Sequence, residues 1–202
     1  DSNAVTSDAV DVVIEEYLAR RNRYERLHWG LGPTNPMLCS PEMMRRLAEF
    51  SAAHDLPVFM HFYQSRAEAV GSRQLMTAYG GSLMGLLDEV GLLNERLALA
   101  HSIWTSQEEV IALAGAGANV ILNIASNMKS KGGVPPLRDF VDAGIPLALG
   151  SDNSGCSDSQ NMFQQMKLVA SLAAISEPEP GPPTAADTVR YATEGGARAV
   201  GL

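Results

Sequence analysis

The sequence has few of the features that mark several large protein classes. Only two cysteines occur among its 202 residues, Cys39 and Cys156, and they fit no Cys-x-x-Cys or zinc-finger spacing. We therefore expect free thiols in a reducing compartment. No apolar run approaches the roughly 18 residues of a membrane helix, and no signal-peptide pattern opens the chain. These absences predict a cytoplasmic protein without a membrane partner.

Basic residues are also scarce, and they are scattered along the chain. Lys and Arg number 15 against 23 Asp and Glu, which gives a formal net charge of −8 at pH 7. Phosphate contacts need clustered Lys and Arg, so this balance argues against nucleic-acid binding and favours a small-molecule partner. Self-association is left open. The apolar share of 46% is ordinary for a globular protein with a buried core.

Motifs for nucleotide binding and for acyl-enzyme chemistry are missing as well. The pair Gly115-x-Gly117 precedes a strand-like segment and lacks the third glycine of a dinucleotide-binding loop. The sequence has no phosphate-loop motif, and no Ser, His and Asp set indicates an acyl-enzyme. Any chemistry must therefore come from other side chains.

Apolar strand-like segments alternate with helical ones along the chain. Strands are predicted at 27–33, 56–62, 97–100, 118–124 and 145–152, and helices at 9–18, 41–54, 82–90, 105–114, 137–141, 158–174 and from 184 onward. The segments 63–81, 125–133 and the proline-rich 178–183 are predicted as connections. Five strands that alternate with helices predict an α/β fold with a parallel sheet. Nothing resembles an interdomain linker, so we expect one domain over residues 1–202.

Three of the predicted strands have, at or near their carboxyl ends, residues of the types that commonly bind metals. His61 and His101 each follow an apolar run, and Asp152 ends a third. The carboxyl ends of parallel strands are where ligands bind, both in open sheets and in barrels. Each residue alone has a structural explanation, because Asp is a common turn residue and a single buried His commonly bonds to backbone. Their recurrence at three strand ends favours one shared site. His28 and His54 lack this pattern and are expected to be structural.

The shared site favours a barrel over a flat sheet. Strands lie about 4.8 Å apart, so His61 and Asp152 would be separated by about 14 Å in a flat sheet kept in chain order. A barrel curves these ends around one axis, although this reasoning assumes the site that it explains. A complete (β/α)8 TIM barrel needs about 250 residues and eight strand-helix units. We therefore predict an incomplete barrel of this type, with roughly strands four to eight present and the first strands absent.

Several longer segments together resemble the amidohydrolase superfamily, in its branch of cytosine, guanine and adenosine-type deaminases and triazine hydrolases. They are LGPTNPMLCSPEMM, VFMHFYQSRAE, GLLNERLALAHSIWTSQEEV, GANVILNIASNMKSKGGVPPL and IPLALGSDNSGCSDSQNMFQQMKL. The resemblance covers nearly the whole chain, and its specificity lies in the order and spacing of these segments.

The resemblance implies a metal-dependent hydrolase that uses water. His61 and Asp152 would be metal ligands, for one divalent metal with zinc expected in preference to iron. Asp152 would also take a proton from the attacking water, whose pKa the metal lowers. His101 would bond to that water or to the substrate. Ser126 and Asn127 would belong to the loop that walls the substrate pocket.

Two departures from the family pattern change these expectations. Relatives carry a His-x-His on their first strand that supplies two further ligands, and this chain has none. Catalytic zinc usually has three protein ligands or more, so we expect the chain alone to be inactive or weakly metallated. Gln64 stands where deaminases of this branch usually have Glu, and Gln cannot carry a proton.

The implied function is hydrolysis of a non-peptide carbon–nitrogen bond, with deamination of an N-heterocycle as the first expectation. Gln64 could still orient a substrate by hydrogen bonds, and it is included among the expected catalytic residues with His101 and Asp152. One alternative is a hydrolase of another leaving group, such as an amide, an alkylamine or a halide. Another is a non-catalytic α/β module in which His61, His101 and Asp152 are structural.

Overall fold

A parallel four-stranded sheet organises the chain. The computed structural model describes residues 7–176, 181 and 183–202, so Pro178, Pro180 and Pro182 of the predicted proline-rich loop lie outside the described residues. The strands follow chain order, β1-β2-β3-β4. Their bounds are β1 Val58–Phe62, β2 Leu97–His101, β3 Asn119–Leu122 and β4 Leu147–Leu149. All pairs are parallel, which confirms the predicted α/β class.

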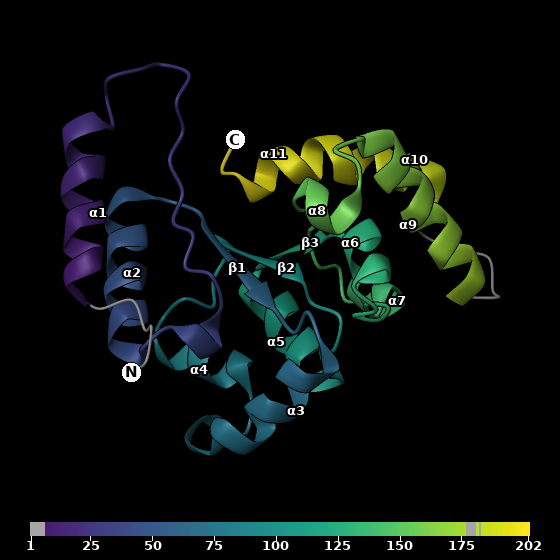
Figure 1. Cartoon of the computed structure of the whole chain (residues 1–202), viewed down its shortest axis with the longest axis horizontal. Coiled ribbons are helices and arrows are strands. Elements are labelled where there is room, and N and C mark those ends of the chain that lie inside the picture. The colour runs from purple at the N-terminus through teal and green to yellow at the C-terminus, as the bar shows by residue number, and fades with distance from the viewer. Residues whose placement is uncertain (1–6, 177–180, 182) are drawn as a thin grey trace.

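Helices connect and cover the strands. They are α1 Ser7–Arg20, α2 Pro41–His54, α3 Arg66–Leu75, α4 Leu83–Glu89, α5 Gln107–Ala116, α6 Ile124–Lys129, α7 Leu137–Asp142, α8 Ser154–Ser157, α9 Met162–Ser176, α10 Ala185–Arg190 and α11 Gly196–Ala199. Shorter turns are η1 Pro36–Leu38, η2 Thr77–Tyr79 and the π-helical η3 Tyr191–Gly195. In Figure 1 the strands lie at the centre, with α1 and α2 on one side and α9 and α10 on the other. No helix in the described part of the chain is long and apolar enough to cross a membrane.

The two faces of the sheet are covered differently. Alternation along β1 buries Val58, Met60 and Phe62 in the main apolar core. The opposite face carries a small cluster that joins Ala98, Ala148 and Ala199 of α11. The C-terminal helical segment therefore lies across this second face.

The predicted strand at 27–33 is largely wrong. Only Leu31 pairs with the sheet, through an isolated parallel bridge to Val58. Gly30 and Gly32 weaken an extended segment, and Pro33 has no amide hydrogen for a strand ladder. The segment still lies along β1, because the Leu31 amide donates to Pro57 O at 2.8 Å and the Phe59 amide donates to Leu31 O at 2.8 Å.

Several helices differ from the predictions. The segment 63–81 contains helix α3, and the segment 125–133 is helical through Lys129 because α6 begins at Ile124 and shortens the predicted strand. The capping box of α5 uses Ser106 and Glu109, since the Thr105 hydroxyl donates to Ser102 O. The predicted helix 158–174 begins only at Met162, after the short α8. Asp158 separates them with a left-handed φ of 63°.

Both cysteines are free thiols, as the sequence predicts.

Candidate functional site

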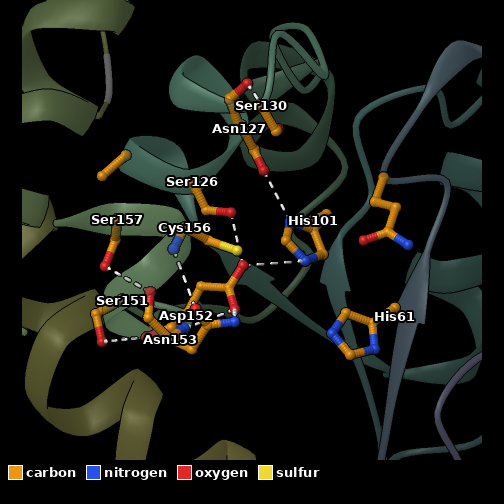
Figure 2. A network of polar contacts seen from close by, with 12 residues as sticks. His61, His101, Ser126, Asn127, Ser130, Ser151, Asp152, Asn153, Cys156 and Ser157 are labelled. Atoms are coloured by element: carbon orange, nitrogen blue, oxygen red, sulfur yellow. Dashed lines mark hydrogen bonds and ion pairs between the residues drawn. The ribbon is translucent and has the colours of Figure 1, made fainter.

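The carboxyl ends of β1 and β2 bring His61 and His101 together. Their rings stack with centroids 5.4 Å apart and planes 20° apart. His101 pairs with Phe62, so alternation alone would direct it to the face opposite His61. Its φ of 74° interrupts that alternation at the last residue of β2. Figure 2 shows the two rings side by side, with Asp152 facing His101.

The ring of His61 is held by a backbone carbonyl. Thr34 O lies 2.7 Å from His61 Nδ1, and the same carbonyl accepts the His61 amide at 3.0 Å. A carbonyl can only accept, so His61 carries its proton on Nδ1 when neutral. The unprotonated Nε2 is then available as a metal ligand, an arrangement that is common for metal-binding histidines.

His101 is buried and is oriented by an amide side chain. Its Nδ1 lies 2.8 Å from Asn127 Oδ1, and its Nε2 lies 3.9 Å from Asp152 Oδ2. Burial lowers the pKa of His101 and the nearby His61 lowers it further, while the Asn127 bond and the Asp152 carboxylate act in the opposite direction. The net result is a pKa below the ordinary histidine value, which favours a neutral imidazole at neutral pH.

Asp152 follows β4, and its carboxylate accepts two short hydrogen bonds and a longer one from Asn153 Nδ2 at 3.4 Å. Ser126 Oγ donates to Oδ2 at 2.6 Å, and the Asn153 amide donates to Oδ1 at 2.7 Å. Burial raises the pKa of Asp152, but the hydrogen bonds from Ser126 and Asn153 together with the nearby His101 and His61 lower it, and the net pKa is below its ordinary value. The side chain is therefore a carboxylate at neutral pH. Figure 2 shows it between Ser126 and His101.

The two predicted pocket residues lie within this network. Ser126 and Asn127 are both on α6, and both are almost completely buried. Asn127 Nδ2 has no hydrogen-bond partner in the described part of the chain. Gln64 lies just beyond β1, and its side chain is exposed. Its backbone N–H donates to Glu68 Oε2 at 3.1 Å.

Left-handed backbone occurs at three of the strand ends that form the site. Tyr63 after β1, His101 and Ser102 at β2, and Asp152 after β4 have φ values of 44°, 74°, 47° and 58°. Such conformations cost about 1–3 kcal/mol for residues other than glycine, and they persist only where surrounding contacts enforce them. Four of the seven non-glycine residues with left-handed backbone in the described part of the chain therefore surround one set of polar side chains.

The donor set fits part of a metal site. Nε2 of His61 and the carboxylate of Asp152 retain free lone pairs, and both side chains are held in place by other bonds. No group of three His, Cys, Asp or Glu within the described residues could hold a metal ion. The chemistry of these two side chains suits two positions of a metal's coordination shell, and further ligands would have to come from elsewhere; the predicted roles of His61 and Asp152 as ligands stay predictions.

Sequence reasoning missed the residues that hold His61. Thr34 acts through its backbone, so its side chain gives no signal. Asn35 and Glu68 bond to each other, and Glu68 bonds to the turn after β1. The pattern Ser65-x-x-Glu68 could have marked the start of α3.

The other two histidines lie apart from this network. His54 packs against Tyr17 and Phe50, and His28 is exposed. The structural role predicted for these two histidines stays a prediction.

Comparison with known proteins gives consistent matches over most or all of the chain. The model of the amidohydrolase family matches residues 1–202. A 5-methylthioadenosine/S-adenosylhomocysteine deaminase of Pyrococcus furiosus is 34% identical over 187 residues, which are 93% of this chain and 44% of that protein. A 5'-deoxyadenosine deaminase of Methanothermobacter thermautotrophicus is 32% identical and covers 88% of this chain and 41% of its own length.

Solved structures match equally well. An adenosine deaminase from Xanthomonas campestris with bound zinc has a TM-score of 0.88 at 27% identity, covering 96% of this chain and 44% of its own. An atrazine chlorohydrolase from Arthrobacter aurescens complexed with zinc has a TM-score of 0.85 at 26% identity, covering 99% and 48%. The chain spans less than half the length of each of these relatives.

Proposed function

The chain belongs to the amidohydrolase family, and from this membership we propose that the full-length protein carrying it is a metal-dependent hydrolase of non-peptide carbon–nitrogen bonds. The proposed reaction is hydrolytic deamination of a small N-heterocycle. Relatives named as deaminases of adenosine-type compounds support this substrate class.

The proposed metal ligands in this chain are His61 and Asp152. One divalent ion is proposed, zinc in preference to iron, because similar structures from two organisms hold zinc. When bound, the metal would make a water molecule acidic enough to attack near neutral pH. The remaining ligands would be supplied by residues outside this chain.

The residues around these ligands have separate proposed roles. Asp152 accepts the proton of the attacking water, and the bond from Ser126 Oγ to its Oδ2 fixes the carboxylate for this step. His101 directs Nε2 toward Asp152 Oδ2, so it can hold the water or the substrate by a hydrogen bond. Ser126 and Asn127 line the same side of the site, where the substrate would bind.

The proposed architecture is the last part of a (β/α)8 barrel within a single domain. The four parallel strands in chain order and the TM-scores of 0.85 and 0.88 support it, as does the share of 44–48% that the match occupies in those structures.

One observation carries the proposed function, namely the grouping of His61, His101 and Asp152. The two imidazole rings stack, His101 Nε2 lies 3.9 Å from Asp152 Oδ2, and each Nδ1 is held by a separate acceptor. Because both Nδ1 atoms are held by these acceptors, the Nε2 atoms of the two histidines are left for contacts within the site. A non-catalytic module would have no use for the strained strand ends that build this arrangement.

Metal analysis of the full-length protein tests the proposal. We expect about one equivalent of zinc in the reconstituted wild-type protein and a loss of most of it in His61→Ala, because that variant removes a ligand. His54→Ala is the matched control, since His54 lies outside the site, and it should keep its zinc. Absence of zinc from carefully reconstituted wild-type protein would contradict the proposal.

A further inference from the structure

The carboxylate of Glu68 occupies a cradle of donors next to the site. Its Oε1 accepts from the Tyr63 amide at 3.0 Å and from Asn35 Nδ2 at 2.9 Å, and its Oε2 accepts from the Gln64 amide at 3.1 Å. Two successive backbone amides with one residue in the left-handed region form an anion-binding concavity. Tyr63, with φ 44°, provides that geometry. The Glu68 carboxylate is therefore the anion bound by the backbone amides of the strained Tyr63-Gln64 turn.

This arrangement differs from the helix caps elsewhere in the chain. Glu68 is the third residue of α3, and its own amide bonds to the Ser65 side chain at 3.2 Å. At the corresponding position of α5 and α10, Glu109 and Asp187 each accept the amide of their own capping residue. Glu68 instead reaches the two amides that precede its capping residue. The hydrogen bonds of the Glu68 carboxylate thus stabilise the turn after β1 and do not cap the first residue of α3.

A short path of contacts connects Glu68 with His61. The Asn35 side chain bonds to Glu68, and Asn35 is 5% exposed, so the Asn35 end of this link is buried while Glu68 is half-buried. Asn35 directly follows Thr34, whose carbonyl accepts the His61 ring at 2.7 Å. Glu68 therefore fixes the segment that holds the ring and, on its other side, the Tyr63-Gln64 turn that follows His61.

We propose that Glu68 is a positioning residue that sets the Nδ1-protonated form of His61 and places Gln64 at the rim of the site. The proposal rests on the metal-binding role of His61 given above. Glu68 does not touch the metal or the substrate. Its carboxylate locks Asn35 and the Tyr63-Gln64 turn, so that Thr34 O stays in line with the His61 ring.

Glu68→Gln tests this role in the full-length protein. Glutamine keeps the length of the side chain but replaces one acceptor oxygen with a donor, so one of the three donors of the cradle loses its partner. We expect zinc affinity, measured by competition with a chelator, to fall by about tenfold to a hundredfold, as is typical when a partner of a metal-binding histidine is lost. In the metal-free protein, nitrogen NMR should show His61 changing from one protonated form to a mixture.

Glu109→Gln is the matched control. Glu109 is also the third residue of a helix that follows a strand, and it is more buried than Glu68, but it bonds to Tyr63 Oη, Ser82 and Ser106. We expect this variant to keep its zinc affinity and its His61 protonation. Equal losses in both variants would mean general destabilisation and would overturn the proposal. Unchanged zinc affinity and unchanged His61 protonation in Glu68→Gln would also overturn it.

Asn35→Ser provides a second variant if Glu68→Gln does not fold. Serine can still cap η1, as the Asn35 side chain does through the Met37 amide, but it has no amide group to reach Glu68. A smaller fall in zinc affinity with a mixed His61 protonation supports the proposal, and wild-type behaviour overturns it. The NMR measurement needs no metal, so it separates the two proposals. If the wild-type protein held no zinc but Glu68→Gln still changed the protonated form of His61, only the proposed function would be contradicted.

Discussion

The hydrogen bond between His101 and Asn127 shows how one side chain orients another in this site. Asn127 is 1% exposed, and its Oδ1 accepts the Nδ1 proton of His101. This bond leaves Nε2 of His101 free to face Asp152. The predicted place of Asn127 in the substrate pocket stays a prediction, whereas its bond to His101 orients the imidazole ring.

Asn127→Ala should impair catalysis more than substrate binding. Without its acceptor, His101 can protonate on either nitrogen, so we expect kcat to fall by about tenfold to a hundredfold with little change in KM. The unpaired buried donor should also lower the free energy of unfolding by about 1–3 kcal/mol. Met128→Ala is the control on the same helix, because Met128 is 55% exposed. Steady-state kinetics and urea unfolding check both parts, and a wild-type kcat would contradict the role.

The side chain of Gln64 cannot take part in proton transfer, because a side-chain amide does not titrate. We predict that the full-length enzyme works without an acid at position 64, so Gln64→Glu should change kcat on the natural substrate by less than about tenfold. A larger increase would show that proton transfer was the missing function. Gln64→Asn, which is also unable to titrate, separates the effect of charge from that of side-chain geometry.

The loops after β1, β2 and β3 are packed together as one unit. A Cβ atom on Gly132 would lie 2.7 Å from Gln64 O and 2.9 Å from Ile103 Cδ1. Trp104 Nε1 donates to Gly132 O at 2.8 Å, which holds the segment after α6 against the loop after β2. Glycine is therefore required at 132 by close approach to backbone.

Gly132→Ala should separate these loops. The added methyl group cannot be accommodated by a side-chain rotation because its nearest neighbour is a backbone oxygen, so we expect about 1–3 kcal/mol of destabilisation and a raised KM. Gly115→Ala adds the same group on α5, where nothing lies within 4 Å. That control should keep the wild-type KM, and an unchanged KM in Gly132→Ala would show that the loops adjust independently.

Sequence patterns predicted elements well where local signals were strong. Helix α2 begins at Pro41 and ends at His54, as the Ser40 cap and the following Pro indicate. Helix α3 was missed because it has almost no apolar stripe, with only Ala69 and Ser72 buried. The start of α5 was predicted at residue 105 because Thr105 and Ser106 both match the capping pattern, with an acidic residue three positions on, whereas the observed cap is Ser106. Tertiary contacts decided between them, and these are not visible in local sequence.

Prediction of the site had a similar limit. The residue types at strand ends identified His61, His101 and Asp152 as neighbours, and the structure brings His101 within reach of both others. Their orientation could not be predicted, since it depends on left-handed backbone at residues other than glycine. The Thr34 carbonyl was equally hidden, because a backbone acceptor gives no signal in composition.

At the scale of the whole molecule, the C-terminal helical segment spans the sheet from its last strand to its first. A Cβ on Gly195 would lie 2.0 Å from Leu147 O in β4, and a Cβ on Gly201 would lie 3.8 Å from Pro57, next to β1. Between them, Ala199 packs on Ala98 and Ala148. This segment thus holds the strands in their relative positions from the face opposite the main core.

Two adjacent glycines allow a direct test of that packing. Gly195→Ala would force the segment away from β4, and we expect it to lower the free energy of unfolding by about 1–3 kcal/mol or more. At Gly196 nothing lies within 4 Å, so Gly196→Ala should be neutral or should stabilise the helix by up to about 1 kcal/mol. Urea unfolding of the two variants measures the difference. Equal stabilities would show that the segment does not need this close approach.

The carbonyl of Thr34 that holds His61 has a consequence for the order in which the protein matures. His61 is oriented only when the segment before β1 lies along that strand, and Asp152 joins it only after three further parallel strands have paired through their crossovers. Such long-range pairings form slowly, and no short segment contains a preformed site. Metal would therefore be taken up by protein that has already folded, unlike in domains whose folding a metal drives. For the proposed zinc site, we predict that full-length protein prepared without metal is already folded and takes up zinc without refolding.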